Sequence, residues 1–371
     1  MNGSVVLRCK NNDEPAWQCV HTIRTSFAYI LYTKQHTLLY EVSVMFRRIA
    51  MVLLAGMVLA SCAGIGGSDT TAVRKIVVGM PYIPNVQFAA FYVAKEQGYF
   101  AAEGLDVSFD YNFENDVVQR VATGAGIDFA LASADTILLA RAQSVPVVAV
   151  LATSQVFPVG FISKQGLPLA TPADLKGKVV GIPGRFGASY FGLNALLASA
   201  GMTEADVTIQ EIGFNQTPAL IEDKVQVISG YVNNEPIVLE KNGVAVNVLR
   251  VSDFFAVGSD HLIVSEAFLT ADREVVKVFT RALKKGMQSA IANAESAHAD
   301  ALKQIPEAQH GDTTVSMAVL KATTPMWLGT DGSLGAITPK AWENSASVLT
   351  AMGKLPQPAD LPKAYDLDIN Q

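Results

Sequence analysis

Short, strongly apolar runs alternate with amphipathic stretches along residues 75–249, which is typical of a chain that forms strands and helices in turn. This βαβα order predicts an α/β protein whose mostly parallel sheet is covered by helices on both faces. The predicted strands are 75–79, 105–111, 128–132, 145–153, 179–182, 208–212 and 225–230, and the predicted helices are 87–97, 116–122, 136–143 and 189–200.

From His261 onward the spacing of apolar residues is helical. Residues 273–292 carry one apolar stripe at i, i+3 and i+4 positions, as an amphipathic helix does. Two further helical patterns cover residues 316–323 and 339–352. We expect these helices to close one lobe of the protein, with an irregular tail after Pro356.

One local pattern occurs twice, 100 residues apart, at 127–139 and 227–239. In each copy a strand ends in polar residues, an acidic residue follows and a helix begins, with Asp135 in the first copy and Glu235 in the second. Two lobes with the same plan are therefore expected, and the polar residues lie where α/β sheets bind ligands, at the carboxyl ends of strands. The alternative is that both sets merely cap helices.

The amino-terminal region carries an export pattern. Residues 1–44 show no helical or strand period, whereas a basic pair and the apolar run 49–59 follow Met45. The run is shorter than the roughly 20 residues that a membrane helix needs, so it is predicted to be a signal peptide. Leu-Ala-Ser before Cys62 resembles the bacterial lipobox, in which the cysteine is lipidated and becomes the first mature residue. The alternative is a buried helix with an incidental cysteine.

Composition predicts an acidic protein. The 371 residues are 50% apolar and 17% charged, with a net charge of −6. Removal of residues 1–61 leaves 22 basic and 31 acidic side chains, a net charge of −9. This balance disfavours nucleic acid as a partner. All three cysteines lie within the first 62 residues, which excludes a disulfide or a thiolate metal site from the rest.

The length beyond the leader exceeds one ordinary core, so two lobes are expected. We predict that residues 62–73 are a lipid-anchored tether, that residues 74–158 and 265–371 form lobe one, and that residues 159–264 form lobe two. No second apolar run is long enough to span a bilayer, so the chain is not itself a permease.

Signals of catalysis are weak. His261, His298 and His310 have no partner at metal-ligand spacing, and neither a Gly-x-Ser-x-Gly elbow nor a nucleotide-binding glycine motif occurs. Catalysis by scattered carboxylates stays open. We predict a binding protein rather than an enzyme, without a resident cofactor or metal.

The first candidate ligand-binding segment follows the first strand, at 81–88. Its prolines stiffen a loop that places Tyr82 and Phe88 near the amides of Asn85 and Gln87, a combination suited to stacking a planar ring and reading its edge. The alternative is a strand-to-helix turn in which Asn85 caps and Phe88 packs inward.

The second candidate segment is glycine-rich and precedes a helix, at 181–190. Glycines let backbone N–H groups approach a ligand at the positive end of the helix. The candidate contacts are Phe186, Gly187, Ser189 and Tyr190. The alternative is a tight turn in which Ser189 caps the helix.

The third candidate segment is 231–236, with Tyr231, Asn233 and Glu235. A carboxylate beside amides accepts hydrogen bonds from ring N–H or hydroxyl donors, and Ser133 with Asp135 is its counterpart in lobe one. Two aromatic residues are ambiguous: Phe157 is a hinge element or a cleft wall, and Trp327 is a cleft wall or part of the core.

These segments resemble the NMT1/THI5-like family of ABC-importer solute-binding proteins, which includes sulfonate, thiamine-pyrimidine and riboflavin binders. The resemblance rests on the segments 82–88, 94–107, 172–178 and 233–236, and covers residues from about 75 to 350. It implies a type II periplasmic-binding-protein fold, with two lobes of mixed, mostly parallel sheets and a cleft between them. It also implies a monomer that delivers one small molecule to a permease powered by a separate ATPase.

Within that family, Phe88 stands where pyrimidine binders commonly carry histidine. The segment 184–190, with Asn215, Gln216 and the segment 233–235, resembles riboflavin-binding members. The ligand implied is riboflavin, with a thiamine pyrimidine precursor second and a sulfonate third. The enzymatic branch, a pyrimidine synthase, depends on an iron site, a cysteine-rich motif and a histidine, so the absence of cysteine beyond Cys62 disfavours it.

Overall fold

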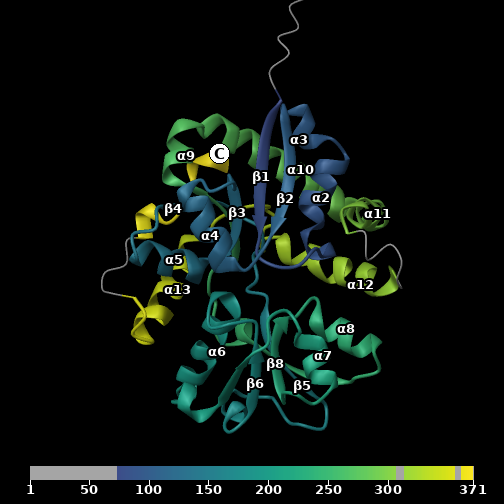
Figure 1. Cartoon of the computed structure of the whole chain (residues 1–371), viewed down its shortest axis with the longest axis vertical. Coiled ribbons are helices and arrows are strands. Elements are labelled where there is room, and N and C mark those ends of the chain that lie inside the picture. Colours follow the sequence, from purple (N-terminus) through teal and green to yellow (C-terminus); the bar gives the residue numbers. More distant parts are fainter. Residues whose placement is uncertain (1–72, 306–312, 356–360, 371) are drawn as a thin grey trace, which may run out of the picture. The chain divides into compact units, whose positions relative to one another are not determined.

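The computed structural model describes residues 73–305, 313–355 and 361–370. The chain divides into residues 1–70 and 71–371, and every described element belongs to the second unit (Figure 1). The predicted leader 1–61, the predicted lipidation site Cys62 and almost all of the predicted tether 62–73 lie outside the described residues.

Five strands form the sheet of the first lobe: β1 (Arg74–Met80), β2 (Leu105–Tyr111), β3 (Phe129–Ser133), β4 (Val147–Ala152) and β10 (Asp260–Ser265). Their spatial order is β2-β1-β3-β10-β4. β1 lies parallel to β2 and β3, whereas β10 runs antiparallel to both β3 and β4.

Five more strands form the sheet of the second lobe: β5 (Val159–Lys164), β6 (Val179–Ile182), β7 (Thr208–Glu211), β8 (Val227–Tyr231) and β9 (Val246–Arg250). Their order is β7-β6-β8-β5-β9, with β5 antiparallel to β8 and β9 and the other pairs parallel. The two sheets share one plan, in which β3 corresponds to β8. The repeated sequence pattern therefore marks equivalent strands, and the predicted α/β fold with mixed, mostly parallel sheets is confirmed.

In each sheet the antiparallel strand is the first strand that the chain forms after it crosses from the other lobe. β5 follows a crossing at residues 153–158, and β10 follows the return crossing at residues 251–259. The crossings are joined to each other, because Ser259 Oγ donates to the Val156 carbonyl at 2.8 Å. The two lobes are thus connected by a paired hinge.

The predicted lobe boundary at residues 264 and 265 is wrong, because β10 is a strand of the first sheet rather than the end of lobe two. The expectation of helical structure from His261 onward is wrong for the same segment. β10, with the sequence DHLIVS, has the apolar core Leu262–Ile263–Val264 and is almost wholly buried between β3 and β4, which suits a central strand. The hydrophobic pattern also predicts no strand at residues 159–164, which form β5.

Helices cover both faces of each sheet. One face of the first sheet packs against α2 (Ala89–Glu96), α10 (Arg273–Ala292), α11 (Ala294–Gln304) and α12 (Thr313–Thr323), and the other against α4 (Glu114–Thr123), α5 (Ala134–Ala142) and α13 (Pro339–Ala351). The second sheet carries α6 (Gly187–Ser199) on one face and α7 (Gln216–Ile221) with α8 (Glu235–Lys241) on the other. The short helices α3 (Tyr99–Ala102) and α9 (Glu266–Ala271) complete the first lobe.

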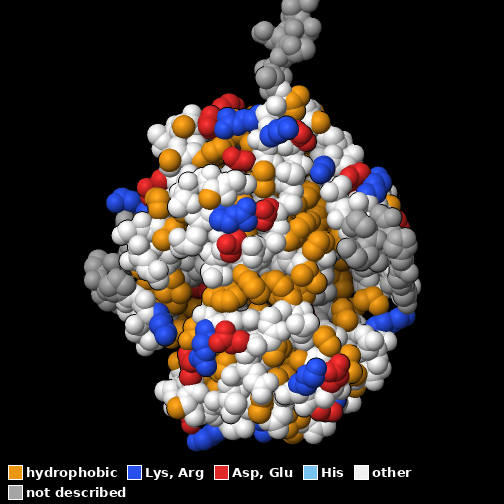
Figure 2. Space-filling model, in the orientation of Figure 1, with side chains coloured by type: hydrophobic (Ala, Val, Ile, Leu, Met, Phe, Trp, Pro, Cys, Tyr) orange, Lys and Arg blue, Asp and Glu red, His pale blue; other side chains and the backbone are white. Residues whose placement is uncertain are grey.

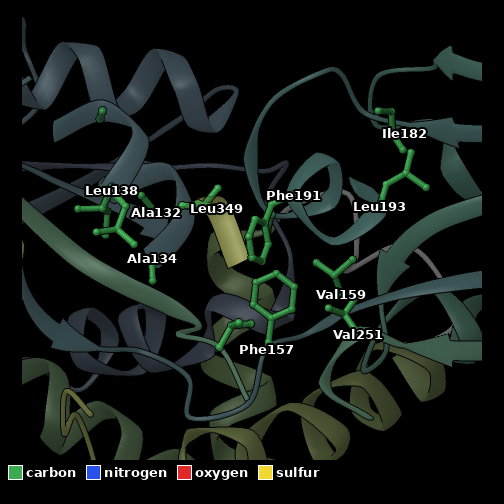
Figure 3. Packing of buried hydrophobic residues seen from close by; sticks show 14 of the residues in the cluster. Ala132, Ala134, Leu138, Phe157, Val159, Ile182, Phe191, Leu193, Val251 and Leu349 are labelled. Atoms are coloured by element: carbon green, nitrogen blue, oxygen red, sulfur yellow. The ribbon is translucent and has the colours of Figure 1, made fainter. Parts of the chain in front are cut away.

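One hydrophobic cluster runs through the hinge and joins the lobes. It contains Leu138 and Leu349 of the first lobe together with Leu193 of the second. Phe157 and Phe191 meet edge to face at its centre, with ring centroids 5.7 Å apart (Figure 3). Apolar burial thus stabilises the hinge itself and not only the two sheets.

A stack of aromatic rings fixes α10 on the first sheet. Phe279 lies flat against Phe129, with ring centroids 4.1 Å apart, and against Phe100, with ring centroids 4.7 Å apart.

Among the described helices none has the length and apolar character needed to cross a membrane. The 20-residue helix α10 carries several charged residues along its length.

Replacement of Gly286 on α10 by alanine is predicted to destabilise the folded protein. A Cβ there would overlap the Ala90 carbonyl oxygen of α2 and approach Ala94 Cβ to 2.9 Å. We expect Gly286→Ala to lower the free energy of unfolding by about 1–3 kcal/mol, although alanine is the better helix former by about 1 kcal/mol. Urea denaturation measures the change. Gly166→Ala, at a glycine with open space around it, is the control; equal stability of both variants would contradict the packing argument.

Candidate functional site

A cavity lies between the two lobes, with an empty volume of about 1190 Å³ that includes its open mouth. Hydrophobic side chains form a band across the surface where the lobes meet (Figure 2). The first lobe contributes Tyr82, Gln87, Phe88, Glu114, Asp260, Thr323, Met326 and Trp327, and the second contributes Phe186, Gly187, Ser189, Phe214, Gln216, Tyr231, Asn233 and Glu235. A cleft lined by aromatic side chains and a few polar groups is typical of a small-molecule site.

The ends of secondary-structure elements bring these side chains together. Tyr82 follows β1, Tyr231 ends β8, and Asp260 begins β10. Glu114 and Glu235 are the first residues of α4 and α8. The cleft therefore lies at the carboxyl ends of parallel strands, as in other open α/β sheets.

Aromatic rings from both lobes meet at this cleft. Tyr82 contacts Phe214 edge to face, with ring centroids 4.8 Å apart. Phe113 lies 4.8 Å from Phe214 and 5.3 Å from Phe186. Tyr82 and Phe113 belong to the first lobe and the other two rings to the second, so these contacts form only when the lobes approach each other.

Glu235 forms a second link between the lobes. Its carboxylate accepts hydrogen bonds from the Tyr231 backbone N–H at 2.6 Å and from Asn234 Nδ2 at 3.1 Å, both in its own lobe. The Tyr82 hydroxyl of the other lobe donates to it at 3.4 Å. Burial raises the pKa of Glu235, while the surrounding donors oppose that shift. Burial also raises the pKa of Tyr82, with the nearby Glu235 charge adding to it.

Two more carboxylates, Glu114 and Asp260, line the cavity, and a third, Asp135, is buried near Glu114. Glu114 Oε1 accepts from the backbone N–H and the hydroxyl of Ser133, each at 2.7 Å. Burial, followed by the charge of Glu114, raises the pKa of Asp260 to about 7. The same two causes raise the pKa of the fully buried Asp135. No Lys, Arg or His occurs among the described residues that line this cavity, so these groups are not neutralised by a cation there.

Two buried amide oxygens face no donor. Gln216 and Asn233 are each 5% exposed and line the cavity. Gln216 Oε1 and Asn233 Oδ1 have no hydrogen-bond partner among the described residues, although Asn233 Nδ2 donates to Thr323 at 2.8 Å. A buried acceptor without a donor is costly, so an N–H or O–H donor of a bound molecule would stabilise each of these two side chains. The described residues form no cluster of His, Cys, Asp or Glu that would hold a metal ion.

Most of the residues singled out from the sequence line the cavity: Tyr82, Gln87, Phe88, Phe186, Gly187, Ser189, Tyr231, Asn233 and Glu235. Phe88 also packs against the first-lobe core. Trp327 is 4% exposed and lines the cavity, so it is core and cleft wall at once. Ser189 does not cap α6, whose N-cap is Phe186.

The other residues singled out lie outside this lining. Asn85 accepts from the Gln87 backbone N–H and caps the short turn Val86–Phe88, and Asn215 is exposed and donates to the Ile212 carbonyl. Ser133 holds Glu114, and Phe157 packs in the hinge core against Phe191. The Tyr190 hydroxyl binds Glu204. Asp135 and Tyr190 line a neighbouring cavity instead.

The sequence patterns do not single out Glu114, Asp260 or Phe214. Asp260 is the first residue of β10, in a segment predicted to be helical, and Glu114 precedes the residues predicted for its helix. Phe214 is a single aromatic residue in a loop. Gln216 is indicated by the sequence only through the resemblance to riboflavin-binding members, beside the candidate Asn215.

Comparison with known proteins points to one family. A family model described as NMT1/THI5 like matches residues 85–297. The riboflavin-binding protein RibY of Chloroflexus aurantiacus is 45% identical over 297 residues, which cover 79% of this chain and 85% of that protein. The formylaminopyrimidine-binding protein of Halalkalibacterium halodurans is 30% identical, over 86% of this chain and 97% of that protein.

More distant similarities extend to enzymes and to the fold alone. A 4-amino-5-hydroxymethyl-2-methylpyrimidine phosphate synthase of Aspergillus parasiticus is 28% identical, over 56% of this chain and 64% of that protein. The alkanesulfonate-binding protein SsuA of Xanthomonas axonopodis, bound to MOPS, superimposes with a TM-score of 0.61 at 16% identity, covering 79% of this chain and 98% of that one. The last similarity shows the shared periplasmic-binding-protein fold.

The raised pKa of Asp260 predicts a pH-dependent stability. Between the ordinary aspartate pKa of about 3.9 and the folded value of about 7, the folded protein holds the proton that the unfolded chain releases, so its stability falls as the pH rises. Because the loss of stability begins near pH 4, we expect the free energy of unfolding of Asp260→Asn to exceed that of the parent by a margin that grows by at least about 1 kcal/mol between pH 5 and pH 8. Urea denaturation at both pH values measures this. Asp253→Asn, at an exposed carboxylate, is the control; the same pH slope in parent and Asp260→Asn would contradict the prediction.

Proposed function

This chain belongs to the NMT1/THI5-like family, and on that premise we propose that it is a substrate-binding protein that captures riboflavin between its lobes and delivers it to the permease of an ABC importer. The relative at 45% identity, which spans most of the chain, is a riboflavin-binding protein. Because the relatives of this chain include both vitamin-binding proteins and synthases, the residues that line the cavity also have to support the choice of riboflavin as the ligand.

The observation that carries the proposal is the pairing of aromatic walls with acceptors that lack donors. A flavin offers a planar ring for Tyr82, Phe88 and Phe186 to contact, and its ring N–H and hydroxylated side chain supply donors. Gln216 Oε1 and Asn233 Oδ1 are buried acceptors that need such donors. Burial of the ring supplies most of the affinity, and the acceptors select the polar edge and the polyol.

Capture follows from the contacts between the lobes. A ligand that touches both walls binds the closed form better than the open form and so shifts the population toward closure. The Tyr82–Glu235 hydrogen bond and the Tyr82–Phe214 contact add to the same closed form. Closure removes water from the ring, and reopening at the permease releases the ligand unchanged.

We further propose an extracytoplasmic monomer anchored by a lipid on Cys62, with a permease subunit and its ATPase as partners. The export pattern before Cys62 and the binding-protein relatives support this placement. A binding role without catalysis is favoured because the two relatives of higher identity are binding proteins, whereas the synthases match at 24–28% identity.

A thiamine pyrimidine precursor is the second candidate ligand. It is favoured by the 30% identity to the formylaminopyrimidine-binding protein over nearly its whole length. Such a ring is smaller and has no polyol, so it would leave more of the aromatic wall and one or more of the buried acceptors without a partner.

We expect the purified protein to quench riboflavin fluorescence on titration at micromolar concentration, because stacked aromatic rings surround the bound flavin. The same protein is titrated with formylaminopyrimidine by calorimetry, and each ligand is recovered and analysed after incubation. Binding of the pyrimidine without quenching of riboflavin would replace the first ligand by the second. Recovery of a chemically altered ligand would contradict the binding role.

Gln216 is predicted to contribute directly to riboflavin affinity. Gln216→Ala removes a buried acceptor, and the loss of about 1–1.5 kcal/mol corresponds to roughly tenfold weaker binding. Fluorescence titration measures the dissociation constant. Gln210→Ala, at an exposed glutamine of β7, is the matched control and should bind like the parent. An unchanged affinity in Gln216→Ala would remove this residue from the ligand contacts.

A further inference from the structure

The start of α6 in the second lobe is covered by a side chain of the first lobe. Helix α6 has 13 residues, and its N-cap residue Phe186 supplies no side-chain hydrogen bond to the backbone N–H groups of the first turn. Glu114 Oε2 instead accepts from the Ala188 N–H at 3.4 Å. Gly187 has a φ of +68°, and a Cβ there would overlap Glu114 Oε2, so the carboxylate sits directly against the first turn of the helix.

Glu114 is held in this position from its own lobe. Its other oxygen accepts two hydrogen bonds from Ser133, each at 2.7 Å, and the residue is 9% exposed. Backbone N–H groups at a helix N-terminus attract anions, including phosphate and sulfonate groups. The place that such a group of a ligand would take at α6 is therefore occupied by a carboxylate of the protein.

The surroundings of Glu114 also disfavour a second anion. Asp260 lines the same cavity, and Asp135, 1% exposed, has no hydrogen-bond partner for either carboxylate oxygen among the described residues. The nearest cation in the α6 loop, Arg185, is paired with Glu204 and Glu211 and belongs to the lining of the neighbouring cavity. An anionic ligand would thus meet carboxylates without a compensating cation in the described lining of the cleft.

We propose that Glu114 is a specificity-determining residue, which makes the cleft select uncharged ligands and reject their phosphorylated counterparts. This inference rests on the proposed function for its first ligand pair, riboflavin and flavin mononucleotide. The rejection has a simple physical origin: a phosphate group either displaces Glu114 from the helix terminus or lies beside it in a poorly solvated cleft, where like charges repel strongly.

The test compares each neutral ligand with its phosphate ester. Parent, Glu114→Gln and Glu240→Gln proteins are titrated with riboflavin and flavin mononucleotide, and with 4-amino-5-hydroxymethyl-2-methylpyrimidine and its phosphate. Glutamine keeps the shape of Glu114 and an oxygen for Ser133 but removes the charge. Glu240 is an exposed glutamate of α8, so its substitution changes the net charge equally without touching the cleft.

We expect the parent to bind flavin mononucleotide at least about tenfold more weakly than riboflavin. Glu114→Gln should narrow that ratio by about fivefold or more, mainly through tighter binding of the phosphate ester, and Glu240→Gln should leave the ratio unchanged. Thermal melting verifies that each variant is folded. Should Glu114→Gln fail to fold, Asp260→Asn removes a neighbouring charge and should narrow the ratio in the same direction.

The outcomes separate this inference from the proposed function. Equal affinity of the parent for riboflavin and flavin mononucleotide, or an unchanged ratio in folded Glu114→Gln, would overturn the role of Glu114 and leave riboflavin binding intact. If only the pyrimidine binds, the riboflavin proposal fails, and the same ratio measured on the pyrimidine pair decides the role of Glu114. Absence of binding by both neutral ligands would overturn both.

Discussion

The exchange of one antiparallel strand between the two sheets is the constraint on which the rest of this structure depends. β5 follows the crossing from the first lobe and pairs in the interior of the second sheet, whereas β10 follows the crossing from the second lobe and pairs in the interior of the first sheet. Neither sheet is therefore complete without a strand that follows a hinge crossing. The crossings hydrogen-bond to each other, and Phe157 packs on Phe191 beside them. Two lobes tied in this way can change their separation about the hinge, and the cleft lies between them.

The electrostatic character of that cleft follows from which residues stand at the strand and helix ends. Glu114 and Glu235 are the first residues of helices, and Asp260 is the first residue of a strand. Burial raises the pKa of Asp260 and Glu235, because desolvation disfavours the charged form and no lysine or arginine in the described lining compensates it. The amide oxygens of Gln216 and Asn233, which have no donor among the described residues, add two acceptors to the cleft. The proposed ligand, riboflavin, offers these acceptors the N–H of its ring and the hydroxyl groups of its side chain.

Several of the same side chains also hold the lobes against each other. Tyr82 reaches Glu235, Tyr82 and Phe113 reach Phe214, and Glu114 reaches the start of α6. Under the proposed function, ligand recognition and lobe closure use shared groups, so a ligand that contacts both walls of the cleft shifts the same open–closed equilibrium that these contacts set. This sharing explains why residues far apart in the chain have to be considered as one site.

The sequence by itself determined the elements whose periodicity is strong and the site residues that lie in local clusters. The apolar stripe of α10, the strand Leu105–Tyr111 and the repeat around Asp135 and Glu235 were all legible, because burial on one face imposes a period and turn residues bracket it. Most of the candidate residues in the segments 81–88, 181–190 and 231–236 do line the cleft, since each segment lies at the carboxyl end of a strand that points there.

Only the tertiary structure decided where the returning chain belongs and which lone residues join the site. The apolar part of β10 is only the three residues 262–264, too short a run to distinguish a buried strand from a helix by its period, and pairing with β3 and β4 settles it. Glu114 and Phe214 carry no local signal, and Asp135, Tyr190 and Phe157 look like site residues but point elsewhere. The physical reason is that a side chain's partners depend on how the lobes and layers pack, and that packing brings together residues that no local pattern connects.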